Sequence, residues 1–387
     1  MAPQWNVHRK LLNSMFSLKI LQSYLPIFNK ESKILVSRLE DLCNRKDPID
    51  ICMYTKTMTY DAIYHTTLNK ELSTQQNQNF DLLESSNKVA AICGKRVFNP
   101  FLRWDFIYRL TSTYREEKKY EKIIREPTIK AIEERKLIWK ENFEKSQEIQ
   151  STNSENEEDF RKPQIFVDQL MKLLMIEKKF TQEDVIGEAS AVIGGGYETT
   201  GNALAYCILM LAMFPENQDK MYEEIKSVVF DEDVHCEDLN KCHFIERFIK
   251  EVLRLFPSAP LIGRKAADTI KLGKYIIPEG TNFLIPIILV HRSREIWGST
   301  AENFDPDRFL PENMENIHPY AFLPFAGGPR HCIGIKYTYM IIKTALIHIV
   351  RNFKFRTDLK LEDLDFEWDI TLHLLNKHMV YVEKRNH

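Results

Sequence analysis

The chain has 387 residues, a formal net charge of −2, 44% hydrophobic residues and 28% charged residues. This balance is typical of a globular protein and gives no basic signal for nucleic acid. The seven cysteines are scattered and odd in number, which argues against a disulfide framework and favours a reducing, cytosol-facing environment. We find no run of about 18 apolar residues and no signal-peptide pattern, so no transmembrane span is predicted in this chain.

Helical periodicity dominates the first part of the chain. Apolar spacing predicts helices over residues 5–45, with a break at Pro26, and again over residues 48–70 and 78–95. Residues 115–147 combine many Lys, Glu and Arg side chains with spaced apolar residues. This pattern predicts a long amphipathic helix whose charged face is solvated.

The second part adds the strongest helix and the only strand signals. The polar residues 146–163 predict an exposed loop within a domain. Thr181 is a plausible cap for a helix over residues 181–213, and residues 334–352 predict another helix. Short strand patterns occur at residues 262–264, 270–277, 281–286, 353–357 and 379–383. We therefore expect one domain over residues 1–387, mostly α with a minor β component.

Near the N-terminus, Trp5 and Arg9 are four residues apart and share a helix face. By themselves they are most simply the start of an amphipathic helix. They gain meaning only together with the motifs further along the chain.

Three consecutive glycines, residues 194–196, interrupt the predicted helix 181–213 and precede Glu198 and Thr199. Each glycine weakens a helix by about 1 kcal/mol, so a kink or the close approach of a flat ligand is expected. The alternative is a helix crossing made possible by small residues. A phosphate loop is disfavoured because the glycines lie within a helix and no Gly-Lys-Ser/Thr follows.

Glu251 and Arg254 are three residues apart on a predicted helix and can pair. The simplest reading of such a pair is a surface ion pair that contributes about 0–1 kcal/mol. A zinc site at Cys236 and Cys242, each next to a histidine, is not expected. The gap between these cysteines exceeds the usual spacing of zinc ligands, and no second pair follows.

The most informative segment is 325–334, with the sequence Phe-Ala-Gly-Gly-Pro-Arg-His-Cys-Ile-Gly. It holds Cys332 in a glycine-rich turn just ahead of the helix predicted over residues 334–352. Backbone N–H groups at a helix N-terminus favour a thiolate, and a thiolate is a ligand for transition metals, including haem iron. An isolated cysteine would more simply be a buried packing residue.

The segment resembles the haem-binding loop of the cytochrome P-450 family, Phe-x-x-Gly-x-Arg-x-Cys-x-Gly. It matches that pattern at Phe325, Gly328, Arg330, Cys332 and Gly334. The other motifs occur in the family's order. Residues 195–200 resemble its oxygen-activation motif, Glu251 and Arg254 its Glu-x-x-Arg motif, and Trp5 and Arg9 its Trp-x-x-x-Arg motif.

The resemblance implies the cytochrome P-450 fold, a helical haem-binding domain with small β-sheets, and haem b as the cofactor. Cys332 would be the axial ligand of the iron. Trp5, Arg9 and Arg330 would contact the haem propionates, with Arg264 as a weaker candidate. Gly195 stands where many related proteins carry a glutamate that bonds the haem, so the haem is expected to be non-covalent apart from the Cys332–Fe bond.

The implied activity is a monooxygenase that inserts one oxygen atom from O2 into a lipophilic molecule such as a fatty acid, steroid, hormone or xenobiotic. Glu198 and Thr199 would relay protons, and a Glu251–Arg254–Arg308 network would hold the segment that leads to Cys332. Electrons would come from NADPH through a reductase docking near Arg9, Lys10 and Lys336. Cytochrome b5 is an optional second donor.

The resemblance is strongest to the insect branch of the fatty-acid-hydroxylase-related clan and implies a monomer on the cytosolic face of the endoplasmic reticulum membrane. Family members are typically longer at the N-terminus. The membrane anchor, the first sheet strands and the loop over the substrate pocket are therefore expected to be missing. Two alternatives remain: a haem-thiolate isomerase or dehydratase, and a truncated, non-catalytic haem-binding remnant.

Overall fold

A computed structural model describes residues 2–43, 45–150 and 165–385 of the chain. Its helices are α1 (Ala2–Asn13), α2 (Leu18–Gln22), α3 (Leu25–Glu40), α4 (Ile51–Leu68), α5 (Phe80–Phe98), α6 (Asp105–Arg109), α7 (Ser112–Gln150), α8 (Phe166–Met171), α9 (Gln182–Met213), α10 (Pro215–Val228), α11 (Cys236–Lys241), α12 (His243–Leu255), α13 (Ile287–His291), α14 (Arg294–Trp297), α15 (Pro311–Met314) and α16 (Ile335–Asn352).

The strands are short and lie mostly in the second half of the chain. They are β1 (Ile49–Asp50), β2 (Leu261–Lys265), β3 (Ile270–Leu272), β4 (Tyr275–Ile277), β5 (Asn282–Pro286), β6 (Phe353–Arg356), β7 (Phe366–Trp368), β8 (Leu372–Leu374) and β9 (Met379–Lys384). All pairs are antiparallel: β1–β9–β6 form one sheet, and β2–β5, β3–β4 and β7–β8 form separate two-stranded ribbons. The prediction of a mostly α fold with minor β content is confirmed.

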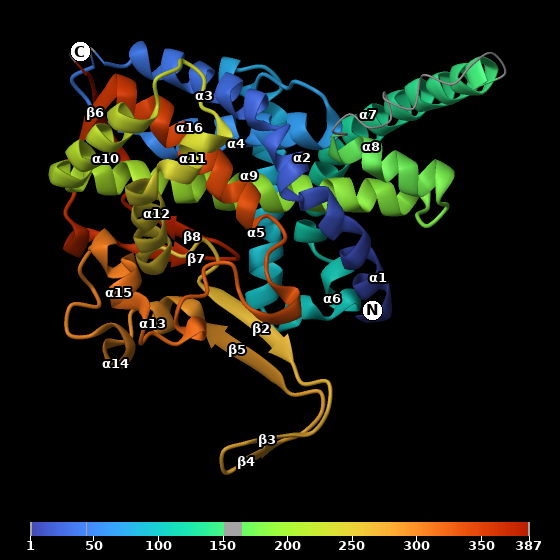
Figure 1. The fold of residues 1–387 in the computed structure, drawn as a ribbon. Helices are drawn as coiled ribbons and strands as arrows, with labels where there is room; N and C mark the ends of the chain where they lie inside the picture. The colour runs from blue at the N-terminus through green and yellow to red at the C-terminus, as the bar shows by residue number, and fades with distance from the viewer. Residues whose placement is uncertain (1, 44, 151–164, 386–387) are drawn as a thin grey trace.

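Helix α9 crosses the molecule, with α3, α4 and α16 on one side and the β2–β5 and β3–β4 ribbons extending away on the other (Figure 1). Its first turn carries a capping box, in which the Thr181 hydroxyl accepts the Asp184 N–H and the Asp184 carboxylate accepts the Thr181 N–H. Residues 203–211 of α9 are all buried, so this half of the helix forms the centre of the core. The second half of α9 is therefore fixed in the core, and the glycine-rich first half extends from it.

The predicted helices and strands lie close to their observed positions, with two differences. Pro26 lies in the first turn of α3 rather than in a break, because proline lacks only an N–H that the first turn leaves unbonded. Residues 146–150 of the predicted loop 146–163 continue α7, and the rest of that loop lies outside the described residues. Within the part of the chain that the structure describes, none of the helices is long and apolar enough to cross a membrane.

Candidate active site

The loop that carries Cys332 closes on itself through backbone hydrogen bonds. The Cys332 N–H donates to the Phe325 carbonyl over 2.9 Å. Ala326 and Gly328 have φ values of 59° and 73°, so two left-handed residues make the tight turn between them. The Gly334 N–H lies 3.3 Å from the Cys332 sulfur, at the start of α16. The thiol is thereby held at the wall of a cavity, which Cys332 lines.

Opposing effects act on the pKa of the free Cys332 thiol. Burial among protein atoms raises the pKa of Cys332, and the Gly334 N–H and the charge of Arg9 lower it by less. The helix N-terminus and Arg9 thus act on the pKa in the expected direction, against the larger opposing effect of burial. A bound metal ion would displace this proton, since thiolate is the ligating form.

The cavity has a volume of about 440 Å³ and is lined mainly by apolar side chains of α1, α9, β2 and α16. Trp5, Arg9 and Arg330 lie together on its wall. The Arg330 guanidinium stacks 3.4 Å from the centre of the Trp5 ring, and Arg9 reaches His331 at 3.5 Å between nitrogen atoms. Neither arginine forms an ion pair with a carboxylate among the described residues. This side of the cavity can therefore accept an anionic group.

The sequence left two explanations for the glycines of α9, the close approach of a flat ligand and a close helix crossing, and the structure is compatible with both. A Cβ atom on Gly196 would lie 2.8 Å from the Ile63 side chain, so Gly196 allows α4 to cross closely. A Cβ atom on Gly195 would meet nothing within 4 Å, and Gly195 lines the cavity. The small-residue crossing and the open wall are thus made by neighbouring glycines of the same helix.

The two residues of the acid–alcohol motif lie in different surroundings. Thr199 lines the cavity, and its hydroxyl donates to the Gly195 carbonyl over 2.9 Å. The Thr199 carbonyl in turn accepts the Ser258 hydroxyl at 2.9 Å. Glu198 is buried outside the cavity lining, with a carboxylate oxygen 3.1 Å from the Lys56 ammonium of α4.

Arg264 lies beside the Cys332 loop rather than in the cavity lining. Its guanidinium donates to the Gly327 carbonyl over 3.3 Å and to the neighbouring Gly263 carbonyl over 2.9 Å. Phe325, in contrast, lines the cavity and packs its ring 5.7 Å from that of Tyr339. Arg264 therefore contacts the backbone of the Cys332 loop from outside the cavity lining.

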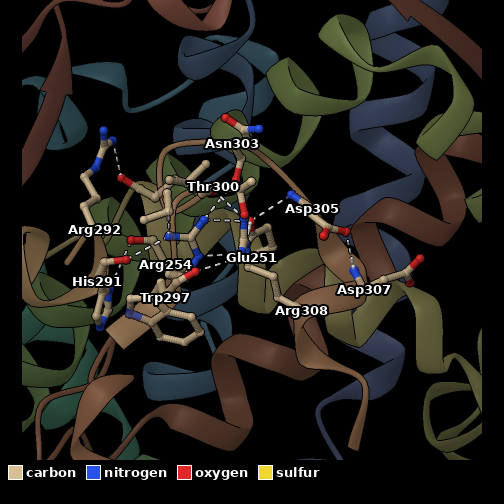
Figure 2. A network of polar contacts seen from close by, with 12 residues as sticks. Glu251, Arg254, His291, Arg292, Trp297, Thr300, Asn303, Asp305, Asp307 and Arg308 are labelled. Carbon is tan, nitrogen blue, oxygen red and sulfur yellow. Dashed lines mark hydrogen bonds and ion pairs between the residues drawn. The ribbon is translucent and has the colours of Figure 1, made fainter. Parts of the chain in front are cut away.

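Glu251 and Arg254 form a fully buried ion pair rather than a surface pair (Figure 2). Arg254 donates two hydrogen bonds to the Glu251 carboxylate, at 2.6 and 2.8 Å. Its remaining N–H groups reach three backbone carbonyls, of His291, Ala301 and Asn303. Arg308 joins the network from the other side, with its Nε atom 3.5 Å from Glu251. The structure thus brings together the three residues expected to form this network.

His291 connects this network to the Cys332 loop. Its Nδ1 atom bonds the Arg254 carbonyl at 3.1 Å, and its Nε2 atom accepts the Leu323 N–H at 2.7 Å. Burial lowers the pKa of His291 to about 4, so the ring is neutral at physiological pH and Nε2 can act as an acceptor. Leu323 lies two residues before Phe325, so the buried ion pair is linked by one side chain to the start of the loop.

Sequence reasoning missed Lys56, Ser258 and His291. Lys56 is far from Glu198 in sequence, and nothing in its own segment indicates a buried partner. Ser258 and His291 belong to no motif, although each bonds a motif residue. Only the position of Ser258, directly after the helix that carries Arg254, could have drawn attention to it.

The residues around the cavity fit a haem group. Among the residues that the structure describes, one cysteine lines the cavity, and Arg9 and Arg330 at one side have no acidic partner. The α9 wall at Gly195 is open, and most of the lining is apolar. Sulfur suits haem iron, an open apolar slot suits a flat macrocycle, and arginines suit its carboxylates.

Comparison with known proteins agrees with this site. The family model described as cytochrome P450 matches residues 1–379. Over 99% of its length, this chain is 33% identical to a probable cytochrome P450 313a4 of Drosophila melanogaster and covers 76% of that protein. It is 32% identical to cytochrome P450 4c21 of Blattella germanica, again over 99% of its length, and covers 75% of that protein. Cytochrome P450 4V2 of Homo sapiens is 31% identical over 99% of the chain and 72% of that protein.

A solved structure shares the fold. The haem domain of a cytochrome P450DA mutant superposes with a TM-score of 0.80 at 19% identity, covering 99% of this chain and 78% of that one. The family match implies a haem b cofactor held through a cysteine–iron bond, in a haem monooxygenase. The chain belongs to the cytochrome P450 family.

Proposed function

We propose that this enzyme inserts one oxygen atom from O2 into a lipophilic small molecule, with electrons supplied by NADPH through a flavoprotein reductase. One observation carries the proposal: the Cys332 thiol and the Thr199 hydroxyl line the same apolar cavity, from the loop and from α9. Apolar cavities of a few hundred Å³ suit small lipophilic ligands. Haem bound through a thiolate supplies the chemistry that cleaves the O–O bond.

The chain's own residues would bind the cofactor and guide protons. Trp5, Arg9 and Arg330 would hold the haem carboxylates, because they group on one side of the cavity. The Thr199 hydroxyl donates to the Gly195 carbonyl, which leaves its oxygen free to accept another hydrogen bond at the cavity wall. Glu198, the residue before Thr199, lies outside the cavity lining and pairs with Lys56, and we assign it the role of proton source for Thr199.

The structural network would preserve the loop geometry on which cofactor binding depends. Glu251, Arg254 and Arg308 are not among the described residues that line the cavity. Through His291 and Leu323 they hold the backbone that precedes Phe325. We therefore assign them a positioning role rather than a catalytic one.

Partners and location follow from family membership and remain part of the proposal. Lys10 and Lys336 are exposed close to the Cys332 loop, whereas Arg9 is half-buried. The two lysines would attract an acidic electron-donor surface, which is a long-range effect weakened by salt. We place the enzyme on the cytosolic face of the endoplasmic reticulum membrane, with a reductase and optionally cytochrome b5 as donors.

The decisive experiment combines a spectrum with an assay. Purified chain loaded with haem is reduced and exposed to carbon monoxide, and we expect the red-shifted Soret band of thiolate ligation, absent in Cys332→Ser. Reconstitution with NADPH and reductase should then place one atom of labelled O2 in a fatty acid or steroid. No haem uptake would overturn catalysis by this chain. Conversion of a peroxide substrate without NADPH would instead indicate an isomerase or dehydratase.

A further inference from the structure

Helix α1 borders the cavity but is only lightly anchored in the core, at the edge of the molecule (Figure 1). One face of α1, at positions 5, 8, 9 and 12, lines the cavity, as spacings of three and four residues along a helix allow. Of residues 4–13, only Leu12 is buried. A helix of 12 residues is marginally stable by itself. The position of α1 therefore depends on the contacts that its side chains make with other elements.

His8 makes the shortest polar contact between α1 and another element. Its Nδ1 atom lies 2.7 Å from a carboxylate oxygen of Glu188, and its Nε2 atom lies 3.9 Å from the Asp184 carboxylate. The His8 ring also packs against the Phe180 ring, with 4.6 Å between their centres. Asp184 belongs to the capping box of α9, so His8 joins α1 to a well-defined end of the central helix.

The other polar contacts of α1 reach the Cys332 loop. Arg9 lies 3.5 Å from a ring nitrogen of His331, and the Trp5 ring stacks against the Arg330 guanidinium at 3.4 Å. Within the part of the chain that the structure describes, no other side chain of α1 hydrogen-bonds or pairs with another element. Helix α1 is therefore held from two sides, to α9 by His8 and to the loop by Trp5 and Arg9.

Glu188 is the only carboxylate residue among the described residues that line the cavity. A charge that faces an apolar cavity is costly unless it is paired, and this one would also repel the carboxylates of a haem bound beside Arg9 and Arg330. The side chains of His8 and Glu188 are 15% and 23% exposed, so water screens their contact only in part. The contact thus pairs the one lining carboxylate and fixes the helix that carries Arg9.

We propose that His8 is a positioning residue for haem binding, which fixes α1 to α9 through Glu188 and so keeps Trp5 and Arg9 in place opposite Arg330. This inference rests on the proposed function, in which Trp5, Arg9 and Arg330 hold the haem carboxylates. Two of these three residues belong to α1. Release of α1 from α9 would therefore loosen most of the carboxylate site without touching Cys332.

The rate of haem loss tests this role directly. The haem-loaded protein is mixed with an excess of apomyoglobin, and transfer of the haem is followed by its absorbance. His8→Leu removes both ring nitrogens and should accelerate haem loss about tenfold or more, the usual scale for a lost outer contact of a metal site. His8→Asn keeps an N–H donor near the position of Nδ1 and should restore most of the retention.

A double-mutant cycle tests whether His8 acts through Glu188. Glu188→Leu should also accelerate haem loss, and adding His8→Leu to it should have little further effect, because both changes remove the same contact. Independent effects that multiply in the double variant would contradict the pairing.

The matched control is Glu183→Gln. Glu183 lies one residue before Asp184, pairs with Arg125 of α7 and is not among the described residues that line the cavity. This variant loses an ion pair at the same end of α9 but leaves α1 in place, so its rate of haem loss should equal that of the wild type. The urea midpoint of the haem-free His8→Leu protein should also stay close to that of the wild type, because α1 adds little to the core.

The outcomes separate this inference from the function on which it rests. If the wild type and His8→Leu lose haem at the same rate while Arg9→Ala loses it faster, the carboxylate site stands and only the role of His8 fails. If the wild type takes up no haem with the spectrum of thiolate ligation, the proposed function fails and the role of His8 fails with it.

Discussion

Two buried polar clusters lie close to the active site and differ in how completely their polar atoms are bonded. In the first, the Glu251–Arg254 pair, all five N–H groups of Arg254 have acceptors, the Glu251 carboxylate and three carbonyls. The neighbouring Arg308 Nε, 3.5 Å from Glu251, makes an ion pair but no hydrogen bond among the described residues. The second, which we call the α4–α9 polar stripe, comprises Cys52, Lys56, Glu198, Asn202, Tyr206 and His378, and three of its buried polar atoms (Asn202 Nδ2, the Tyr206 hydroxyl and His378 Nε2) have no hydrogen-bond partner among the described residues. Both are buried and both contain an acid–base pair.

The difference indicates what each cluster is suited to do. A charge pair whose hydrogen bonds are all made by protein atoms has one favourable arrangement, so it fixes the backbone around it. A polar stripe that leaves donors and acceptors open can exchange partners with water. The first cluster is therefore suited to hold the Cys332 loop in place as a scaffold, whereas the second is held less tightly by protein atoms.

The largest expected effect comes from breaking the scaffold. Glu251→Ala leaves the buried Arg254 charge without its carboxylate and should destabilise folding by about 3–5 kcal/mol, with loss of bound haem. Urea unfolding and the haem-to-protein absorbance ratio measure this. Lys250→Ala is the control on the same helix, because it removes only a partly exposed pair with Glu246 and should cost less than about 1 kcal/mol. Equal losses would show that the buried pair is no scaffold.

The second-largest effect is expected from acid, which should lower the free energy of unfolding through His291. Burial lowers the pKa of His291 to about 4, while the unfolded chain takes up the proton near pH 6.5. Between these values the unfolded state binds more protons, so stability is lost as pH falls from 6.5 to about 4, by up to about 3 kcal/mol. Urea unfolding at a series of pH values should give a shallower acid loss for His291→Gln.

His348 sharpens the acid test, because burial lowers its pKa to about 4 as well. Its ring bonds the Asn29 side chain at 2.7 Å and does not touch the Cys332 loop. His348→Gln should reduce the acid loss to a similar degree while haem retention stays normal. His291→Gln should also weaken haem retention, and equal haem retention in the two variants would contradict the link through Leu323.

The ion pair of the stripe should be less costly to break. Lys56→Met leaves the Glu198 carboxylate without its cation and should cost about 1–3 kcal/mol. The expected loss is smaller than for Glu251→Ala because Glu198 is 8% exposed, whereas Glu251 is fully buried. Urea unfolding of the two variants side by side decides this, and a loss as large as that of Glu251→Ala would make the stripe a second scaffold.

The smallest effect is expected where an oxygen has no protein partner. Tyr206→Phe should change the free energy of unfolding by less than about 0.5 kcal/mol, since it removes no protein–protein hydrogen bond. Tyr60→Phe removes a bond to Ser86 and should cost about 1 kcal/mol. Thermal or urea unfolding compares them. A larger loss of stability for Tyr206→Phe would mean that the Tyr206 hydroxyl makes a stabilising hydrogen bond in the folded protein.

The same contrast explains what the sequence could reveal. Cys332, Glu251 and Arg254 are recognisable because each function needs residue types at short, fixed spacings. The same holds for the helices, whose apolar periodicity is local. Lys56, His291 and His378 act through partners distant in sequence, so no pattern around them carries the information. The burial that raises the Cys332 pKa likewise depends on the whole fold rather than on the residues next to it.

The bonding of Arg254 also makes hydrogen exchange at this side chain a measure of how often the protein opens. Its guanidinium hydrogens are all engaged, and the side chain is 0% exposed. They can exchange with solvent deuterium only when α12 separates from the segments around His291, Ala301 and Asn303. The exchange rate of these hydrogens would therefore report how often the core around α12 opens. If the backbone amides of the Cys332 loop exchange faster than these hydrogens, the loop opens without the core; equal rates would mean that both open together.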